Sequence, residues 1–265
     1  MNTVNLQSPG AAQRVKKLLS LVACAALLAA CGNKPVAPDW ALSAEASSER
    51  AIQAYLQGQQ RVEDLHWGKA RSAVASTGQL ATAAKLELMR CAAQVASLEW
   101  TDCPAYQELA ADAGAEQQAY ARYLAGKVRA QDVALLPPAQ QAVAQILVGA
   151  TAGDASVSSP SSAALLAAIA AIKEPLSRLV AIGVAARTSP SCAILMQPGI
   201  DTASEQGWRR PLMAWLMLQQ EAAAQAGAKD TADKAGKRLK LLNNGTAIPA
   251  RTSAGLSCKA PPLMD

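Results

Sequence analysis

Residues 79–98, QLATAAKLELMRCAAQVASL, have the clearest periodicity in the chain. Apolar side chains recur three or four residues apart along this stretch, at Leu80, Ala84, Leu88, Cys91, Val95 and Leu98. This spacing places them on one face of an α-helix, because a helix completes a turn in about 3.6 residues. The polar side chains of the same stretch fall largely on its other faces. The pattern therefore predicts an amphipathic helix that packs on a hydrophobic core.

The composition extends this prediction to the whole chain. Of the 265 residues, 61 are Ala, 51% are hydrophobic and only 3% are aromatic. Such a chain is too apolar for intrinsic disorder. Alanine has the highest helix propensity, whereas strands favour branched and aromatic side chains. We therefore expect an all-α protein, either an irregular Ala-rich bundle or a solenoid of antiparallel helix pairs.

The chain divides into segments of different character. Residues 31–42 are predicted to be a tether, because two prolines keep residues 31–39 extended and nothing in that stretch could pack a core. Helical patterns fill residues 43–150 and resume at 163–265, with a Ser-rich loop or linker over 151–162 between them. Residues 163–172 are apolar on nearly every side and predict a helix at the centre of the core. Residues 104–113 predict another helix.

The first thirty residues have the features of a targeting signal. Arg14, Lys16 and Lys17 precede an apolar run over residues 18–30. This run is too short to span a bilayer, which takes about 20 residues, and it is typical of a signal peptide. Loss of residues 1–30 leaves a net charge of +2, so the composition gives no support to a nucleic-acid partner.

The end of the apolar run, Leu28-Ala29-Ala30-Cys31 followed by Gly32, resembles the lipobox of bacterial lipoprotein precursors. The resemblance implies cleavage before Cys31 and acylation of its thiol and of the new amine. Two or more acyl chains give stable membrane anchoring, whereas one is marginal. In such lipoproteins an Asp after the acylated Cys favours retention in the inner membrane. Because residue 32 is Gly, the resemblance also implies that the chain is located at the periplasmic face of the outer membrane.

Two helix pairs, over residues 67–92 and 208–242, weakly resemble tetratricopeptide hairpins. Trp67, Gly78 and Ala83 fall near the large and small positions of such a hairpin, and Gly227 and Ala232 repeat the spacing of the latter two. The other consensus positions are poorly met, and no steady period of about 34 residues appears. The pattern favours an irregular helical domain over a regular array.

Four cysteines, Cys91, Cys103, Cys192 and Cys258, remain once Cys24 is removed and Cys31 is acylated. An even number in an oxidising compartment favours disulfides. Of the three connectivities we prefer Cys91–Cys103, which closes a short loop, with Cys192–Cys258, which fixes the tail. A zinc site is disfavoured because the chain has a single His and no Cys-x₂-Cys pair. A buried free thiol at Cys91 is the further alternative.

No catalytic motif is found in the sequence. Nucleophile elbows, phosphate-binding loops and zinc-binding helices are all missing, so we predict no catalytic residue, no metal and no cofactor. His66 follows two acids but fits an exposed helical position better than a general base. A hydrolase that uses carboxylates far apart in the sequence remains an alternative.

Basic residues concentrate near the C-terminus, at Arg209, Arg210, Lys234, Lys237, Arg238 and Lys240, with Lys229 beside them. They form either a binding patch for an anionic envelope polymer or lipid headgroup, or a solvated helix face interleaved with Asp230 and Asp233. From the anchor and the helix pairs we expect a non-catalytic scaffold or accessory of the cell envelope, with envelope proteins as partners. The alternatives are the carboxylate hydrolase and a protein that binds cell-wall polymer or lipopolysaccharide.

Overall fold

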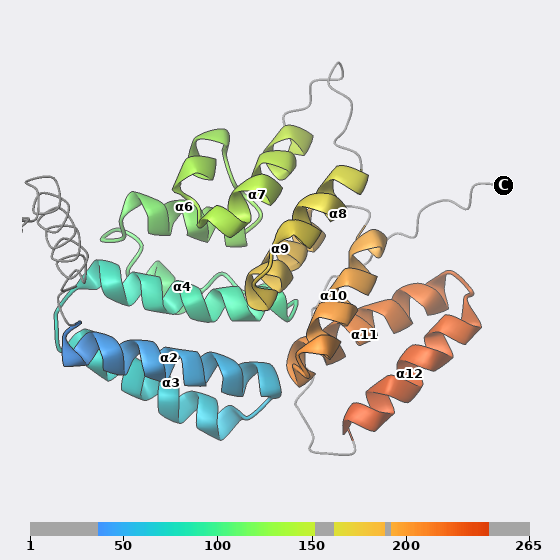
Figure 1. Ribbon diagram of the computed structural model, residues 1–265, viewed down its shortest axis with the longest axis horizontal. Helices are drawn as coiled ribbons and strands as arrows, with labels where there is room; N and C mark the ends of the chain where they lie inside the picture. The colour runs from blue at the N-terminus through green and yellow to red at the C-terminus, as the bar shows by residue number, and fades with distance from the viewer. Residues whose placement is uncertain (1–36, 152–161, 189–191, 244–265) are drawn as a thin grey trace, which may run out of the picture. The chain divides into compact units, whose positions relative to one another are not determined.

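Helices account for most of the described chain, which in the computed structural model comprises residues 37–151, 162–188 and 192–243. Within these residues there is no strand, which confirms the all-α prediction (Figure 1). In chain order the helices are α2 (Asp39–Gln57), α3 (Gln60–Ala75), α4 (Leu80–Ala96), α5 (Pro104–Gln107), α6 (Ala115–Leu124), the 3₁₀ helix η1 (Ala130–Leu135), α7 (Pro138–Thr151), α8 (Ser162–Ala171), α9 (Pro175–Thr188), α10 (Ala193–Glu205), α11 (Arg209–Gln225) and α12 (Lys229–Asn243). All of them belong to one compact unit that begins at Asp39.

Helix α4 has the buried face that its sequence predicts. Ala84, Leu88, Cys91 and Val95 are all buried, whereas Leu80, in the first turn, is exposed. The core that they enter runs from α2 through to α12, so the helical regions on both sides of residues 151–162 share it. The two regions therefore build one core rather than two.

Helix α2 starts earlier than its periodicity indicates. It begins at Asp39, so residues 39–42 of the expected tether are helical. Asp39 supplies a carboxylate in the first turn, which complements the positive end of the helix dipole. By contrast, the helix expected over residues 104–113 is short, since α5 covers only Pro104–Gln107.

The centre of the core is α9, and the prediction that the apolar residues 163–172, which form α8, lie there is wrong. Every residue of α9 from Leu179 to Ala186 is buried, and α9 contacts α4, α6, α7, α8 and α10. Helix α8 buries only Leu165 and Ile169 and leaves most of its alanines exposed. The prediction failed because apolarity on all sides does not require burial when most of the side chains are alanine. Exposure of a small methyl group to water costs little free energy.

Close packing of α9 on α4 depends on Gly183. A Cβ at this position would lie 2.3 Å from the Val95 carbonyl oxygen, closer than atoms can approach. One residue further along α4, the fully buried Trp215 ring of α11 donates from its Nε1 to the Ala96 carbonyl at 3.3 Å. The end of α4 is thus held by both α9 and α11.

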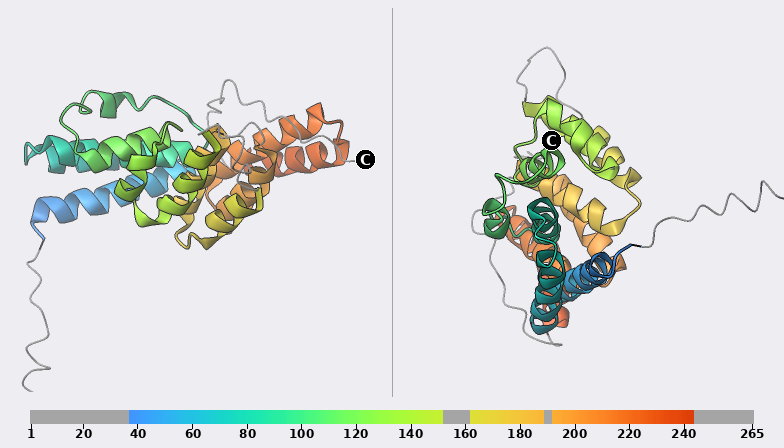
Figure 2. Two further views of the ribbon diagram at one scale, coloured as in Figure 1. Left: turned by 90° about the horizontal axis from the view of Figure 1, so that it is seen from above. Right: turned by 90° about the vertical axis from the view of Figure 1, so that its left-hand side faces the viewer.

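The last two helices form a hairpin that packs at the far end of α2. Gly227, with φ of +72°, makes the turn between α11 and α12, as the sequence predicts. Ala235 and Leu239 bury one face of α12, mainly against α11. The start of α2 and the α11–α12 hairpin lie at opposite ends of this unit (Figures 1 and 2).

Of the two disulfides expected, the one between Cys91 and Cys103 is present, with a Cα–Cα distance of 5.8 Å. It ties α4 to the residue before α5. Cys192 is buried at the start of α10, but Cys258 lies outside the described residues. Also outside them are the predicted signal peptide, Cys31, the C-terminal tail and residues 152–161 of the predicted linker. Over the part of the chain that is described, no helix has the length and apolarity to cross a bilayer.

Candidate functional site

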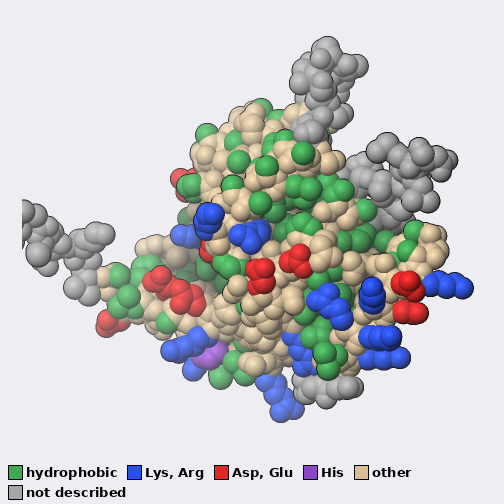
Figure 3. All heavy atoms as spheres, turned by 45° about the vertical axis from the view of Figure 1, so that its right-hand side comes forward, with side chains coloured by type: hydrophobic (Ala, Val, Ile, Leu, Met, Phe, Trp, Pro, Cys, Tyr) green, Lys and Arg blue, Asp and Glu red, His purple; other side chains and the backbone are tan. Residues whose placement is uncertain are grey.

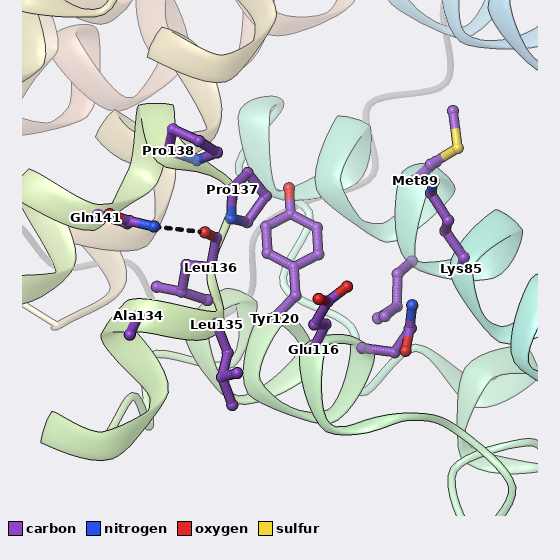
Figure 4. A pocket seen from close by; sticks show the side chains of 12 residues that line it. Lys85, Met89, Glu116, Tyr120, Ala134, Leu135, Leu136, Pro137, Pro138 and Gln141 are labelled. Carbon is purple, nitrogen blue, oxygen red and sulfur yellow. Dashed lines mark hydrogen bonds between the residues drawn. The ribbon is translucent and has the colours of Figure 1, made fainter.

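An open cleft of about 640 Å³ lies beside α4, bordered by α6, η1 and the start of α7 (Figure 4). Its volume is within the usual range for sites that bind small molecules or peptide side chains. Most of the lining is apolar and comes from Leu88, Met89, Tyr120, Ala134, Leu135, Leu136, Pro137 and Pro138. Polar groups at Lys85, Glu116, Gln117 and Gln141 complete it.

The connector from η1 to α7 forms one wall of the cleft. Leu136 is buried, whereas Leu135 remains 38% exposed. Gln141 Nε2 donates to the Leu136 carbonyl at 2.9 Å, as Figure 4 shows. Pro138 is the first residue of α7, where the missing N–H costs nothing and the fixed φ favours the helix. These features fix the backbone next to Leu135, which lines the cleft with an apolar side chain.

An ion pair between the buried Asp132 and the partly exposed Arg122 holds η1 against α6. Arg122 Nε donates to Asp132 Oδ2 at 2.8 Å, and the two groups form a second hydrogen bond at 2.5 Å. The Arg129 backbone N–H also donates to Asp132, at 3.0 Å. These hydrogen bonds, those from Arg122 above all, lower the pKa of the Asp132 carboxyl below its ordinary value. Asp132 is therefore ionised at neutral pH and fixes the cleft wall.

Tyr120 stands at the centre of the cleft (Figure 4). Its ring stacks beside that of Tyr123, with centroids 6.2 Å apart. Tyr123 in turn donates to Gln140 Oε1 at 2.7 Å, and Gln140 Nε2 donates to the Ser177 carbonyl at 2.9 Å. Burial, with a further contribution from the Glu174 carboxylate, raises the pKa of the Tyr120 hydroxyl, so this group stays neutral.

A second hollow, of about 410 Å³, opens next to the cleft along the same stretch of α4. It shares Lys85 and Met89 with the cleft and adds Trp40, Ala44 and neighbouring residues from the first half of α2. Glu45 and Glu49 also line it. The two hollows therefore meet at Lys85 and Met89, at the end of the unit where α2 begins.

The lining of the cleft combines apolar side chains with a few polar groups, a composition suited to binding. Among the described residues, no cluster of His, Cys, Asp and Glu could hold a metal ion. Burial raises the pKa of Glu63, but this carboxylate lies in the core, 3.2 Å from Arg90, and does not line the cleft. His66 is half-buried on α3 and does not line it either.

The basic residues singled out in the sequence have different environments. Lys234, Lys237, Arg238 and Lys240 are all exposed on α12. In Figure 3 basic side chains gather where the α11–α12 hairpin comes forward, with acidic ones beside them. Arg209 is half-buried and donates to the Leu242 carbonyl, so it fastens the hairpin.

The prediction that Arg210 belongs to an external binding patch is wrong. Arg210 is buried, and its hydrogen-bond donors contact groups inside the protein. Its guanidinium lies over the Tyr55 ring at 4.4 Å, and Nε donates to the Tyr55 carbonyl at 2.8 Å. Nη1 lies 3.4 Å from Glu99 Oε1. Arg210 therefore fastens α11 to α2 and is not accessible to an external polymer.

The sequence predicted none of the cleft residues as a site. They come from four elements that are separated along the chain, so no local period marks them. One local signal was present in Leu135-Leu136-Pro137-Pro138, where two leucines precede two prolines between helices. Such a segment cannot continue a helix and holds apolar side chains in a fixed connector.

Comparison of the chain with models of protein families, with curated proteins and with solved structures gives no significant match in any of the three. No relative therefore supplies a role for the cleft or for α12. The function is inferred from the residues and their geometry.

Proposed function

We propose that this protein is a lipid-anchored lipoprotein of the outer membrane that acts at the periplasmic face as a non-catalytic scaffold. In this proposal the cleft beside α4 binds an apolar segment of a partner envelope protein. The observation that carries it is the open, mostly apolar cleft of about 640 Å³. A hydrolase has less support, because the carboxylate with the raised pKa lies away from the cleft.

The lining indicates the chemistry of the partner. Leu135, Met89 and the Tyr120 ring give the cleft an apolar surface. Binding of a partner would remove this surface from water, which favours association. Lys85 and Glu116 add one charge of each sign to the lining. Opposite charges on a partner would set its register more than its affinity. We therefore expect a segment with apolar side chains flanked by an acid and a base.

The position of the cleft suits an anchored protein. Trp40, nine residues after Cys31, lines the second hollow, which meets the cleft at Lys85 and Met89. A tether of residues 31–38 spans at most about 29 Å even when fully extended. Acylation at Cys31 would thus keep this end of the unit close to the bilayer, where proteins of the same membrane lie.

The anchor is tested by replacing Cys31 with Ser and fractionating cells. The Cys31→Ser chain is exported behind a signal peptide that is cleaved without a lipobox, because the apolar run over residues 18–30 would otherwise stay attached. We expect the wild-type chain in the outer-membrane fraction and this chain in the soluble periplasmic fraction, since it carries neither the apolar run nor acyl groups. Mass spectrometry of the wild-type N-terminal peptide should find acyl groups on Cys31. Equal sedimentation of both chains with the membrane would contradict the anchor.

The cleft is tested by placing a photo-crosslinking amino acid at Leu135 and, separately, at Gln117, which lines the cleft from α6. Leu65 provides the matched control, since it is an exposed leucine on α3 that lines none of the pockets described above. We expect one partner to be captured from both cleft positions in intact cells and not from Leu65. Capture from Leu65 alone, or a different protein at each position, would contradict the proposal.

A further inference from the structure

The outward face of α12 carries a concentration of cations that the fold itself does not use. Lys229, Lys234, Lys237, Arg238 and Lys240 are all exposed. Every ion pair found between described residues involves an arginine of another helix, at Arg71, Arg90, Arg122 and Arg210. The α12 cations thus remain available for an external anion.

The packing of α12 fixes which way these cations face. Ala235 and Leu239 are buried against α11, and a helix turns by about 100° per residue. Lys237 therefore lies nearly opposite the buried face, with Lys234 and Arg238 on one side of it and Lys240 on the other. Asp230 and Asp233 are confined to the first turns, so the second half of the helix presents positive charge alone.

A membrane surface is the weaker match for this face. Helices that lie in a bilayer interface bury a broad apolar face among the acyl chains. The apolar face of α12 is already occupied by α11, and Leu241 is the one large apolar side chain among the exposed residues of α12.

The position of α12 within the unit determines which surroundings its cations would face. Arg210 and Trp208 dock the start of α11 on Tyr55 and Gln53, near the end of α2. The 19 residues of α2 extend for about 28 Å. If the chain is anchored at Cys31, as proposed above, the membrane lies near the start of α2 and α12 lies at the opposite end.

We infer that the outward face of α12 binds an anionic polymer of the periplasm, a glycan whose peptide side chains carry free carboxylates, as peptidoglycan does. The direction of this contact rests on the proposed anchoring. Its chemistry rests on Lys234, Lys237, Arg238 and Lys240. A protein with both contacts would connect a membrane-proximal partner to the wall polymer.

The test is co-sedimentation of the purified full-length chain with isolated peptidoglycan sacculi. The Cys31→Ser form is used throughout, so that acylation does not contribute and a failure of the anchoring proposal does not affect the result. The test variant is Lys237→Glu with Arg238→Glu. The matched control is Arg61→Glu with Lys69→Glu, which reverses two exposed charges on α3. Circular dichroism confirms that each chain is folded.

We expect the parent chain to bind sacculi with an affinity that falls as salt rises. The α12 variant should bind at least about tenfold more weakly, and the control within about twofold of the parent. Lack of binding by the parent, or an equal loss in both variants, would overturn the inference. Binding to phosphatidylethanolamine–phosphatidylglycerol vesicles but not to sacculi, again lost in the α12 variant, would assign the helix to the membrane instead.

Discussion

Leu135 and Leu241 are both exposed leucines, 38% and 75% accessible, but they belong to surfaces of opposite kinds. Leu135 borders a cleft assembled from α4, α6, η1 and α7, and its surroundings are apolar. Leu241 sits on a single helix among lysines and an arginine. The cleft depends on contacts between distant segments, whereas the α12 face depends on one hairpin. We therefore propose an apolar partner for the surroundings of Leu135 and not for those of Leu241.

The largest effect should follow from breaking the cleft wall. In Asp132→Ala, Arg122 loses its partner and the Arg129 N–H loses its acceptor. We expect the free energy of unfolding to fall by about 3 kcal/mol, the lower end for a broken buried pair, because Arg122 is partly exposed. Urea denaturation measures this. The control Asp230→Ala, in the exposed first turn of α12, should cost about 0.5 kcal/mol. Equal losses of unfolding free energy in the two variants would show that the cleft wall depends on Asp132 no more than α12 depends on Asp230.

A smaller effect should follow from loosening the hairpin. Leu239→Ala removes a buried side chain that holds α12 on α11, and we expect a loss of about 2 kcal/mol. Because α12 packs mainly on α11, amide hydrogen exchange should increase along α12 and stay unchanged in α4 and α7. Faster exchange in α4 would mean that the basic helix and the cleft form one cooperative unit.

The pH dependence of stability tests the ion pair in the cleft wall. The pKa of Asp132 is lowered in the folded protein, so its stabilising effect is complete above the ordinary value of 3.8 and is lost as the pH falls through the lowered value. The difference in unfolding free energy between wild type and Asp132→Ala should therefore be constant near neutrality and shrink in acid. A difference that is independent of pH down to strong acid would contradict the ionised pair.

The smallest effect should come from a single α12 cation. Lys237 is exposed and takes part in no ion pair with another described residue, so Lys237→Ala should change the unfolding free energy by less than about 0.5 kcal/mol. Thermal or urea unfolding checks this. A large loss of stability would mean that the residue serves the fold, and the case for a binding role would weaken.

Local patterns predicted the elements of this fold well. The buried face of α4 and the turn at Gly227 follow from periodicity and from glycine, which act within a few residues. The central helix was misassigned because α8 and α9 are both apolar, and only tertiary packing decides which of them is enclosed.

The sites were harder to predict than the elements. The burial of Arg210 depends on Tyr55 and Glu99, more than a hundred residues away in the chain. The cleft depends on Met89, Tyr120 and Leu135 meeting from three elements. By contrast, the exposed cations of α12 could be predicted because they lie on one helix whose apolar residues mark the opposite face. Sequence therefore revealed the surface made by one element and missed the surface made by several.

The most direct test of the central claim compares Leu135→Glu with Leu65→Glu in recovery of the partner that is crosslinked from the cleft. A carboxylate at Leu135 would have to be buried without a hydrogen-bond partner when an apolar segment binds, which is costly. We predict that recovery falls at least about tenfold for Leu135→Glu, equivalent to about 1.4 kcal/mol, and that Leu65→Glu leaves it unchanged. Equal recovery from both variants, or an equal loss in both, would contradict the cleft as the binding site.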